Sequence, residues 1–84
     1  MTKEWLTVYK GHKIRVVNTW LSGAKLYVDD ECKDTNQQLF STDATRPVLT
    51  AKLGDESIEI FIKSIFTTKA KICVGGEQVG GDVF

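Results

Sequence analysis

Short runs of strand-forming residues recur along the whole chain, at about one every ten residues. They are rich in Val, Ile, Thr, Tyr and Phe, and Gly, Asp, Asn, Ser or charged residues separate them. This spacing is typical of a β-sandwich or barrel. Only about 42–47 lacks strand character, and Pro47 marks a connection there because proline cannot donate to a sheet. The pattern predicts strands over 4–9, 12–20, 24–29, 36–41, 48–53, 57–66, 69–74 and 77–83.

The two halves of the chain resemble each other when the sequence is aligned with itself at an offset of 46 residues. HKIRVVNTWLSGAKLYVDDE then lies over IEIFIKSIFTTKAKICVGGE, so that Ile14 meets Ile60 and Leu26 meets Ile72. Several matches are two residues apart, as expected of strands that show one face to a core. Either the chain arose by duplication, or two hairpins with the same alternation align by their pattern alone. We expect duplication, with repeats at 1–41 and 48–84.

The turns VDDE (28–31) and VGGE (74–77) occupy matching places in this alignment. Two-residue hairpin loops need positive φ, which Gly tolerates freely and Asp better than most residues. Both turns therefore predict tight hairpins. Together these features predict one all-β domain over 1–84, a seven- to eight-stranded antiparallel β-sandwich or flattened barrel. At 84 residues its stability margin is narrow.

Alternation within the strands predicts which side chains face the core. In the run IEIFIKSIF, Ile58, Ile60 and Ile62 point one way, and Phe66 follows in the same phase. Burial of each such side chain stabilises the fold by roughly 1.5–3 kcal/mol. The remaining inward positions are expected to be Ile14, Val16, Asn18, Trp20, Leu26, Val28, Ile72 and Val74.

The opposite face of the predicted strands mixes apolar and charged side chains. Val17, Tyr27, Phe61 and Ile65 fall on it, among lysines and Arg15. Antiparallel sheets usually show water a more polar face than this. Loops or terminal strands could cover these side chains, or they could form a surface for a protein partner or a second copy. We take these four residues as the candidate interaction surface.

Charge and composition exclude several function classes. The 11 basic and 11 acidic residues cancel, and no basic run is present, so we expect no nucleic-acid partner. No segment has the length and hydrophobicity of a signal peptide or a membrane span, so we expect a cytoplasmic protein without membrane contact. Cys32 and Cys73 lack zinc-site spacing, and we expect both to be free thiols.

Catalytic and metal chemistry find little support in the sequence. The single histidine, His12, starts a strand and has no evident nucleophile beside it, although a pair with either cysteine stays open. The acidic stretch DDECKD does not fit the spacing of a calcium loop. No helix follows the glycines of GGEQVGG to bind a phosphate. We therefore expect no catalytic residue, no metal and no cofactor.

A second function class uses exposed aromatic side chains to bind a small ligand or carbohydrate. Trp5 and Tyr9, with Tyr27 and the amides of Asn36, Gln37 and Gln38, supply the chemical groups. The simpler interpretation is that Trp5 closes one end of the core.

The segment from Trp5 through Gly11-His12-Lys13-Ile14, with Ser22-Gly23 and Leu26-Tyr27-Val28-Asp29, resembles the opening of Fas apoptotic inhibitory molecule domains. It covers about 30 of the 84 residues. The resemblance implies a compact all-β sandwich that acts through protein contacts, without catalytic residues or a cofactor. The chain is one residue shorter before Tyr27, has Asp30 where the family tends to glycine, and loses the similarity after about residue 35. Only the fold is carried over.

These observations rank three function classes. First comes a non-catalytic interaction module that binds a protein partner or forms a homodimer through its apolar outer face. A ligand- or carbohydrate-binding module is the alternative, and an enzyme is third.

Overall fold

Eight strands form among the residues that the structure, a computed structural model, describes: 2–19, 23–37, 46–64 and 67–83. They make two four-stranded antiparallel sheets, ordered β1-β2-β3-β4 (sheet A) and β5-β6-β7-β8 (sheet B). This confirms the predicted all-β fold with eight strands. The strands are β1 (Thr2–Tyr9), β2 (His12–Thr19), β3 (Gly23–Val28), β4 (Glu31–Asn36), β5 (Leu49–Leu53), β6 (Glu56–Ser64), β7 (Thr68–Val74) and β8 (Glu77–Gly81).

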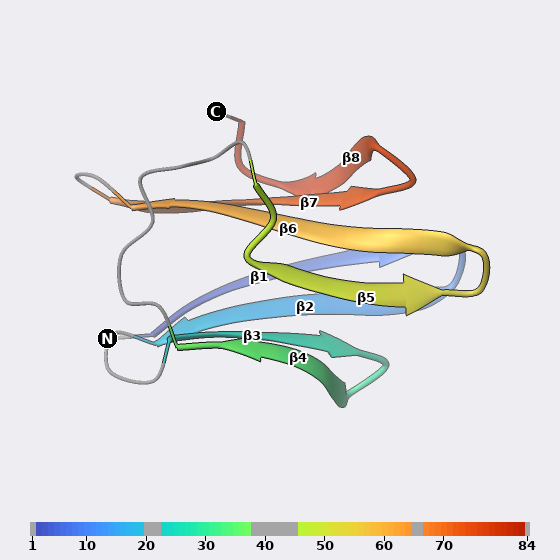
Figure 1. The fold of residues 1–84 in the computed structure, drawn as a ribbon, viewed down its shortest axis with the longest axis horizontal. Coiled ribbons are helices and arrows are strands. Elements are labelled where there is room, and N and C mark those ends of the chain that lie inside the picture. The colour runs from blue at the N-terminus through green and yellow to red at the C-terminus, as the bar shows by residue number, and fades with distance from the viewer. Residues whose placement is uncertain (1, 20–22, 38–45, 65–66, 84) are drawn as a thin grey trace.

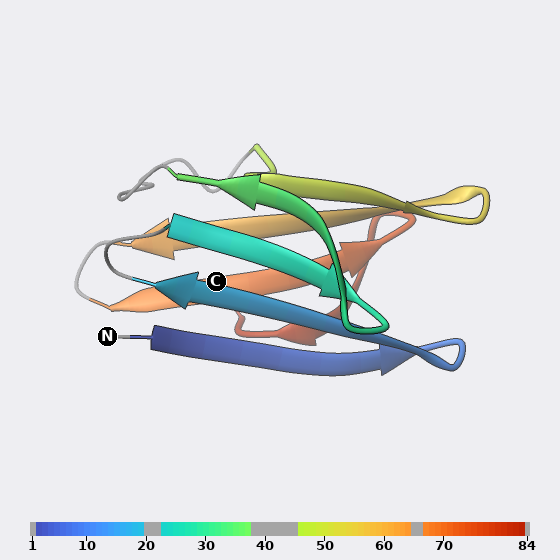
Figure 2. The same cartoon turned by 90° about the horizontal axis from the view of Figure 1, so that it is seen from below.

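The two sheets lie against each other as the layers of a sandwich. Figure 1 shows β6, β7 and β8 of sheet B above β2, β3 and β4 of sheet A, with β5 overlapping β2 in this view. Figure 2 shows the strands of sheet A in front, with β1 at one edge and β4 at the other. Between the layers lies one hydrophobic core that draws on both sheets. Its fully buried members are Ile14, Val16, Leu26, Leu49, Ile58, Ile60 and Ile72. All of these except Leu49 on β5 were predicted to face inward, as were Val28, Ile62 and Val74, which are also buried. Asn18 is only half-buried, and Trp20 and Phe66 lie outside the described residues.

The predicted hairpins at VDDE and VGGE are confirmed. Asp29 and Asp30 have φ of 52° and 68°, and Gly75 and Gly76 have φ of 61° and 86°. Positive φ at both central residues is the geometry whose twist matches that of the flanking strands. The two aspartates adopt it at some cost in backbone strain, because only glycine lacks the Cβ that makes this region unfavourable.

One predicted strand is wrong in its position. The sequence predicted a strand over 36–41, whereas β4 spans Glu31–Asn36. Because the Asp29–Asp30 turn is only two residues long, the chain re-enters the sheet at once and pairs Val28 with Glu31. The segment ECKDTN has few strand-forming side chains, so the turn and not its composition fixes it as an edge strand. Residues 38–41 lie outside the described residues.

The two sheets share the same irregularity in their last hairpin. The pairing of β3 with β4 shifts between Leu26 and Tyr27, and that of β7 with β8 shifts between Ile72 and Cys73, 46 positions later in both cases. In the first hairpin of each sheet, equivalent positions are 44 residues apart. The pair of Trp5 and Val16 in sheet A corresponds to the pair of Leu49 and Ile60 in sheet B. A two-residue difference preserves the alternation of faces. Duplication as the origin of this likeness stays a prediction.

Side chains join the sheets along both pairs of edges. At β1 and β8, Thr7 Oγ1 donates to the Val79 carbonyl at 2.9 Å. At β4 and β5, Asp34 Oδ2 accepts from the Thr50 amide at 2.9 Å, and Asn36 Nδ2 donates to the Val48 carbonyl at 2.9 Å. Edge strands left open invite pairing with another chain. Here each edge faces an edge of the other sheet, which gives the sandwich the character of a flattened barrel.

Candidate interaction face

The structure divides the predicted interaction surface between two opposite faces. Val17 and Tyr27 point outward from sheet A, where they alternate with the buried Val16 and Leu26. Phe61 points outward from sheet B, between the buried Ile60 and Ile62. The prediction of a single surface is wrong, because period-two alternation identifies outward positions but does not say in which sheet they lie. Ile65 lies outside the described residues.

The outer face of sheet A carries two exposed apolar side chains that the sequence interpretation missed. Leu6 is 57% exposed and Val8 is 67% exposed. They alternate along β1 with Trp5 and Thr7, which face inward. Register places Leu6 opposite Arg15 and Val8 opposite Lys13 on β2. The alternation of Glu4, Leu6 and Val8 was the available signal, but nothing in the sequence fixed which phase of β1 faces the core.

Arg15 lies at the centre of this face. Its guanidinium carbon is 4.4 Å from the centroid of the Tyr27 ring, and Nη1 donates to Glu4 Oε2 at 3.1 Å. Arg15, on β2, thus contacts side chains of both neighbouring strands, β1 and β3. Leu6 is its partner in the pairing of β1 with β2. Its Nε is enclosed and has no hydrogen-bond partner among the described residues. Stacking on an aromatic ring is a favourable position for a cation.

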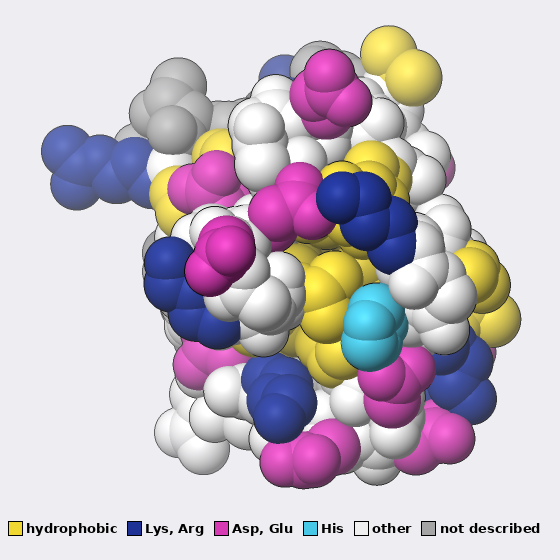
Figure 3. Space-filling model, turned by 90° about the vertical axis from the view of Figure 1, so that its right-hand side faces the viewer, with side chains coloured by type: hydrophobic (Ala, Val, Ile, Leu, Met, Phe, Trp, Pro, Cys, Tyr) yellow, Lys and Arg dark blue, Asp and Glu magenta, His cyan; other side chains and the backbone are white. Residues whose placement is uncertain are grey.

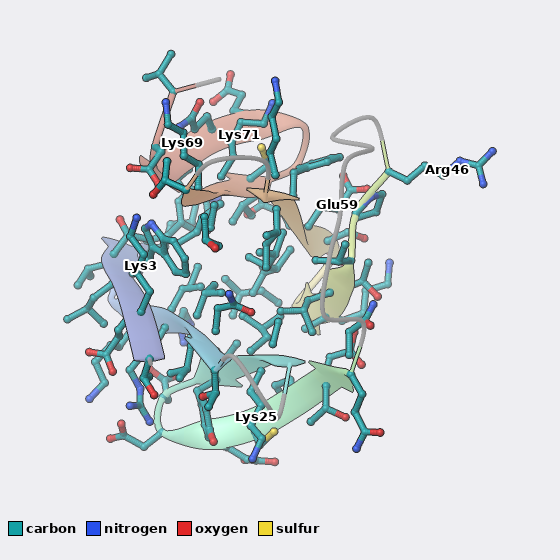
Figure 4. All side chains as sticks on the ribbon, turned by 90° about the vertical axis from the view of Figure 1, so that its left-hand side faces the viewer. Lys3, Lys25, Arg46, Glu59, Lys69 and Lys71 are labelled. Atoms are coloured by element: carbon teal, nitrogen blue, oxygen red, sulfur yellow. The ribbon has the colours of Figure 1, made fainter. Side chains whose placement is uncertain are left out.

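The charges of sheet A compensate one another. Three ion pairs connect neighbouring positions: Arg15 with Glu4 at 3.1 Å, Lys13 with Asp30 at 2.8 Å, and Lys33 with Glu31 at 3.1 Å. Lys25 adds one cation at the loop end of the face (Figure 4). We define the sheet A face as Glu4, Leu6, Val8, Lys13, Arg15, Val17, Lys25 and Tyr27.

The outer face of sheet B is different in character. Phe61 is half-buried, and the Lys71 ammonium lies 5.1 Å from the centroid of its ring. Cys73 shares the face but is only 7% exposed, and burial raises the pKa of its thiol. Both cysteines are free thiols, as predicted, and Cys32 on β4 is exposed.

Trp5 and Tyr9, the candidate ligand aromatics, are both engaged within the fold. Trp5 is 8% exposed, and its Nε1 donates to Asp82 Oδ2 at 2.8 Å. The ligand-binding alternative required an exposed tryptophan. The Trp5 indole is instead part of the core, because its position on β1 faces inward, toward Asp82 in the C-terminal segment. Tyr9 is half-buried and its hydroxyl donates to Glu56 Oε2 at 2.8 Å. Asn36 binds the Val48 carbonyl, and Gln38 lies outside the described residues.

Figure 3 looks onto the end of the sandwich where the hairpin turns gather, and shows the histidine beside acidic and hydrophobic side chains. His12 Nδ1 lies 2.7 Å from Asp29 Oδ2, and the Lys13 amide donates to Asp29 Oδ1 at 2.9 Å. Hydrogen bonding to His12, then to the Lys13 amide, lowers the pKa of Asp29. The partner of His12 is thus a turn carboxylate and not one of the cysteines.

A second polar cluster at the same end joins the sheets. Glu56 on β6 receives hydrogen bonds from Lys10 Nζ at 2.9 Å and from the Tyr9 hydroxyl at 2.8 Å. These bonds, that from Lys10 first, lower the pKa of Glu56. The bond to Glu56 raises the pKa of Tyr9. Both donors come from the β1–β2 hairpin, so the cluster holds sheet A to sheet B.

Within the described part of the chain, no group of three or more His, Cys, Asp or Glu side chains is placed to hold a metal ion. Nor does that part contain a helix of the length and hydrophobicity needed to cross a membrane.

Comparisons with known proteins give no family assignment. No family model matches the chain, no curated protein matches it, and no solved structure matches it.

Proposed function

We propose that this chain is a non-catalytic interaction module that binds a second copy of itself through the sheet A face. The observation that carries the proposal is the exposure of Leu6 and Val8, side by side on β1 with half-buried Val17 and Tyr27 nearby. Apolar side chains gathered on one face and bordered by charges are typical of protein contact sites. Covering them removes apolar surface from water, at roughly 25 cal/mol per Å².

Charge favours a second copy as the occupant of this face. Within this face Glu4 pairs with Arg15, and Lys13 pairs with the adjacent Asp30. Among the described residues only Lys25 of the face lacks an ion pair, so two such faces meet with little electrostatic repulsion. Glu4 and Arg15 also lie on the same face, and a two-fold axis can exchange their partners between copies, as the self-complementary interface of a dimer requires. Tyr and Arg are enriched at the centres of protein interfaces. The outer face of sheet B, with its lysines, would repel its own copy.

The ligand-binding alternative loses one of its two aromatic groups. Trp5 is buried against the C-terminal segment, so its ring cannot stack on a sugar without opening the edge of the sandwich. No contact of the described residues favours this alternative over association.

Light scattering coupled to size-exclusion chromatography tests the proposal. The wild-type chain is expected to show a mass that rises toward twice that of the monomer with concentration. Replacing both Leu6 and Val8 with lysine is expected to leave a monomer at every concentration. Val83→Lys is the matched control, because Val83 is 85% exposed but lies outside the sheet A face. A wild-type monomer throughout the series, or an equal loss of association in the control, would contradict the proposal.

A further inference from the structure

The outer face of sheet B places two lysines directly opposite each other. Lys63 on β6 pairs with Lys69 on β7, so the two side chains leave the same face of adjacent strands. Directly opposite residues have Cβ atoms about 4.5–5.5 Å apart, and like charges at this separation are destabilising. Neither lysine forms an ion pair with a described residue, since all five such pairs involve other side chains.

Two more cations lie around this pair. Lys71 follows Lys69 on the same face of β7, with its ammonium over the Phe61 ring. Lys3 reaches across from β1, and its Nζ donates to the Thr68 carbonyl, one residue before Lys69, at 2.6 Å. Figure 4 looks at this end of the sandwich and shows Lys69 and Lys71 together on the outer side of sheet B, with Lys3 below Lys69. We call Lys3, Lys63, Lys69 and Lys71 the lysine cluster.

Among the described residues, no acid forms an ion pair with Lys63 or Lys69. Asp82 is close enough to Lys3 and Lys69 to interact electrostatically with both. Its Oδ2, however, already accepts hydrogen bonds from the Trp5 indole and from the Ala70 amide. Glu59 shares the face two residues before Phe61, opposite Cys73. Within the described residues, Lys63 and Lys69 therefore face each other without an ion-pair partner, and the Asp82 carboxylate is engaged in holding the fold. A partner that brings negative charge would relieve the repulsion between Lys63 and Lys69.

We infer that the lysine cluster binds an acidic, extended segment of a partner protein. Lys69 and Lys71 are two residues apart on one face of a strand, about 7 Å at the rise of an extended chain. Acidic side chains at alternate positions of an extended peptide repeat at the same distance, so each carboxylate meets one ammonium. This site lies on the sheet opposite the proposed self-association face and does not depend on it.

The aromatic group of this face argues for a peptide over a single-stranded nucleic acid. Proteins that bind single strands stack the bases on open aromatic rings. Phe61 is half-buried and the Lys71 ammonium lies over its ring, so the described residues of this face offer no open ring beside the lysines. The cluster also contains no arginine, the residue best suited to bidentate phosphate contacts.

Fluorescence anisotropy tests the inference with a labelled peptide of alternating Glu and Thr, a Gln-Thr peptide of equal length, and a single-stranded oligonucleotide. We expect saturable binding of the acidic peptide that weakens with salt, and no binding of the Gln-Thr peptide. The double variant Lys63→Gln/Lys69→Gln is expected to bind about tenfold more weakly. The control variant Lys25→Gln/Lys33→Gln, which removes the same charge from sheet A, is expected to bind within about twofold of wild type.

A stability measurement keeps the inference falsifiable through a second readout. Lys69→Glu turns the repulsive pair into an attractive one, and we expect its melting temperature to rise by about 2–4 °C while peptide binding is lost. Four results would each overturn the inference: no saturable binding of the acidic peptide, equal binding by the Lys63/Lys69 double variant, tighter binding of the oligonucleotide than of the peptide, or no rise in the melting temperature of Lys69→Glu. Oligomeric state enters none of these readouts, so they stand apart from the test of self-association.

Discussion

Gly80 on β8 lies against the side chain of Thr7 on β1 so closely that a Cβ at position 80 would be 2.6 Å from the Thr7 Cβ. The Thr7 hydroxyl donates to the carbonyl of the preceding residue, Val79, at 2.9 Å. The contact closes one side of the sandwich, because it brings edge strand β1 of sheet A against edge strand β8 of sheet B. Glycine is needed at position 80 for close approach and not for its backbone angles, since no positive φ occurs there.

Gly80→Ala is therefore expected to destabilise the protein by about 1–3 kcal/mol through overpacking. Thr7→Ala should not rescue it, because the nearest atom is the Cβ that alanine retains, whereas Thr7→Gly should recover part of the loss. Urea denaturation of the single and double variants checks this by a double-mutant cycle. Full rescue by Thr7→Ala would place the clash elsewhere.

Asp82 makes the stability of the fold depend on pH. Its carboxylate accepts from the Trp5 indole and the Ala70 amide, and the bond from Trp5, more than that from Ala70, holds its pKa below the ordinary value. A carboxyl group with a depressed pKa in the folded state stabilises that state above the unfolded pKa, about 3.9. The contribution is lost as the pH falls from there through the folded pKa.

Asp82→Asn should therefore reduce stability at pH 6 and flatten its decline in acid. Melting temperatures measured between pH 6 and pH 2.5 check this. Asp55→Asn is the control, because Asp55 makes no hydrogen bond or ion pair with a described residue. Parallel acid curves for wild type and Asp82→Asn would contradict the assigned role. Asp29 and Glu56, whose pKa values are also lowered, account for the slope that remains.

The core carries most of the stability, and Ile60 lies at its centre. It is fully buried and pairs with Leu49 on one side and Ile72 on the other. Ile60→Ala is expected to cost about 2–5 kcal/mol, through lost burial and the cavity left behind. Leu6→Ala, at an exposed position, should change the stability of the monomer by less than about 0.5 kcal/mol. Equal losses would contradict the assignment of faces, and denaturation at low protein concentration measures both.

The two thiols should differ in reactivity. Cys32 is exposed, whereas Cys73 is buried and its pKa is raised. Because the thiolate is the reacting species, a thiol reagent at mildly alkaline pH should modify Cys32 rapidly and Cys73 slowly. Cys32→Ser should remove the fast phase and Cys73→Ser the slow one. A single rate for both thiols would mean that the face around Cys73 is open.

Sequence alternation predicted the core well because the alternation of side chains along a strand is fixed by its geometry. The inward isoleucines of β2 and β6 could be identified in this way. The self-alignment at an offset of 46 residues is wrong by two in the first hairpin, but the inward assignments stayed correct because side chains alternate with a period of two residues. What alternation does not contain is which sheet a strand joins. For this reason Tyr27 and Phe61 were assigned to one surface although they lie on opposite sides of the molecule.

Two other differences between the prediction and the structure have separate physical causes. β4 was placed too late because its segment is polar and only the two-residue turn before it determines where it begins. Leu6 and Val8 were missed because the phase of β1 follows from Trp5 facing inward, and that depends on the hydrogen bond from its indole to Asp82, 77 residues away in the chain. Such a long-range contact leaves no local signal in the sequence.

Self-association through the sheet A face is the central claim, and amide chemical shifts recorded over a range of protein concentrations test it most directly. We expect the amide signals of Leu6, Val8, Arg15 and Tyr27 to shift progressively with concentration, while those of Phe61 and Lys71 do not. A spectrum independent of concentration, or shifts confined to the outer face of sheet B, would contradict it.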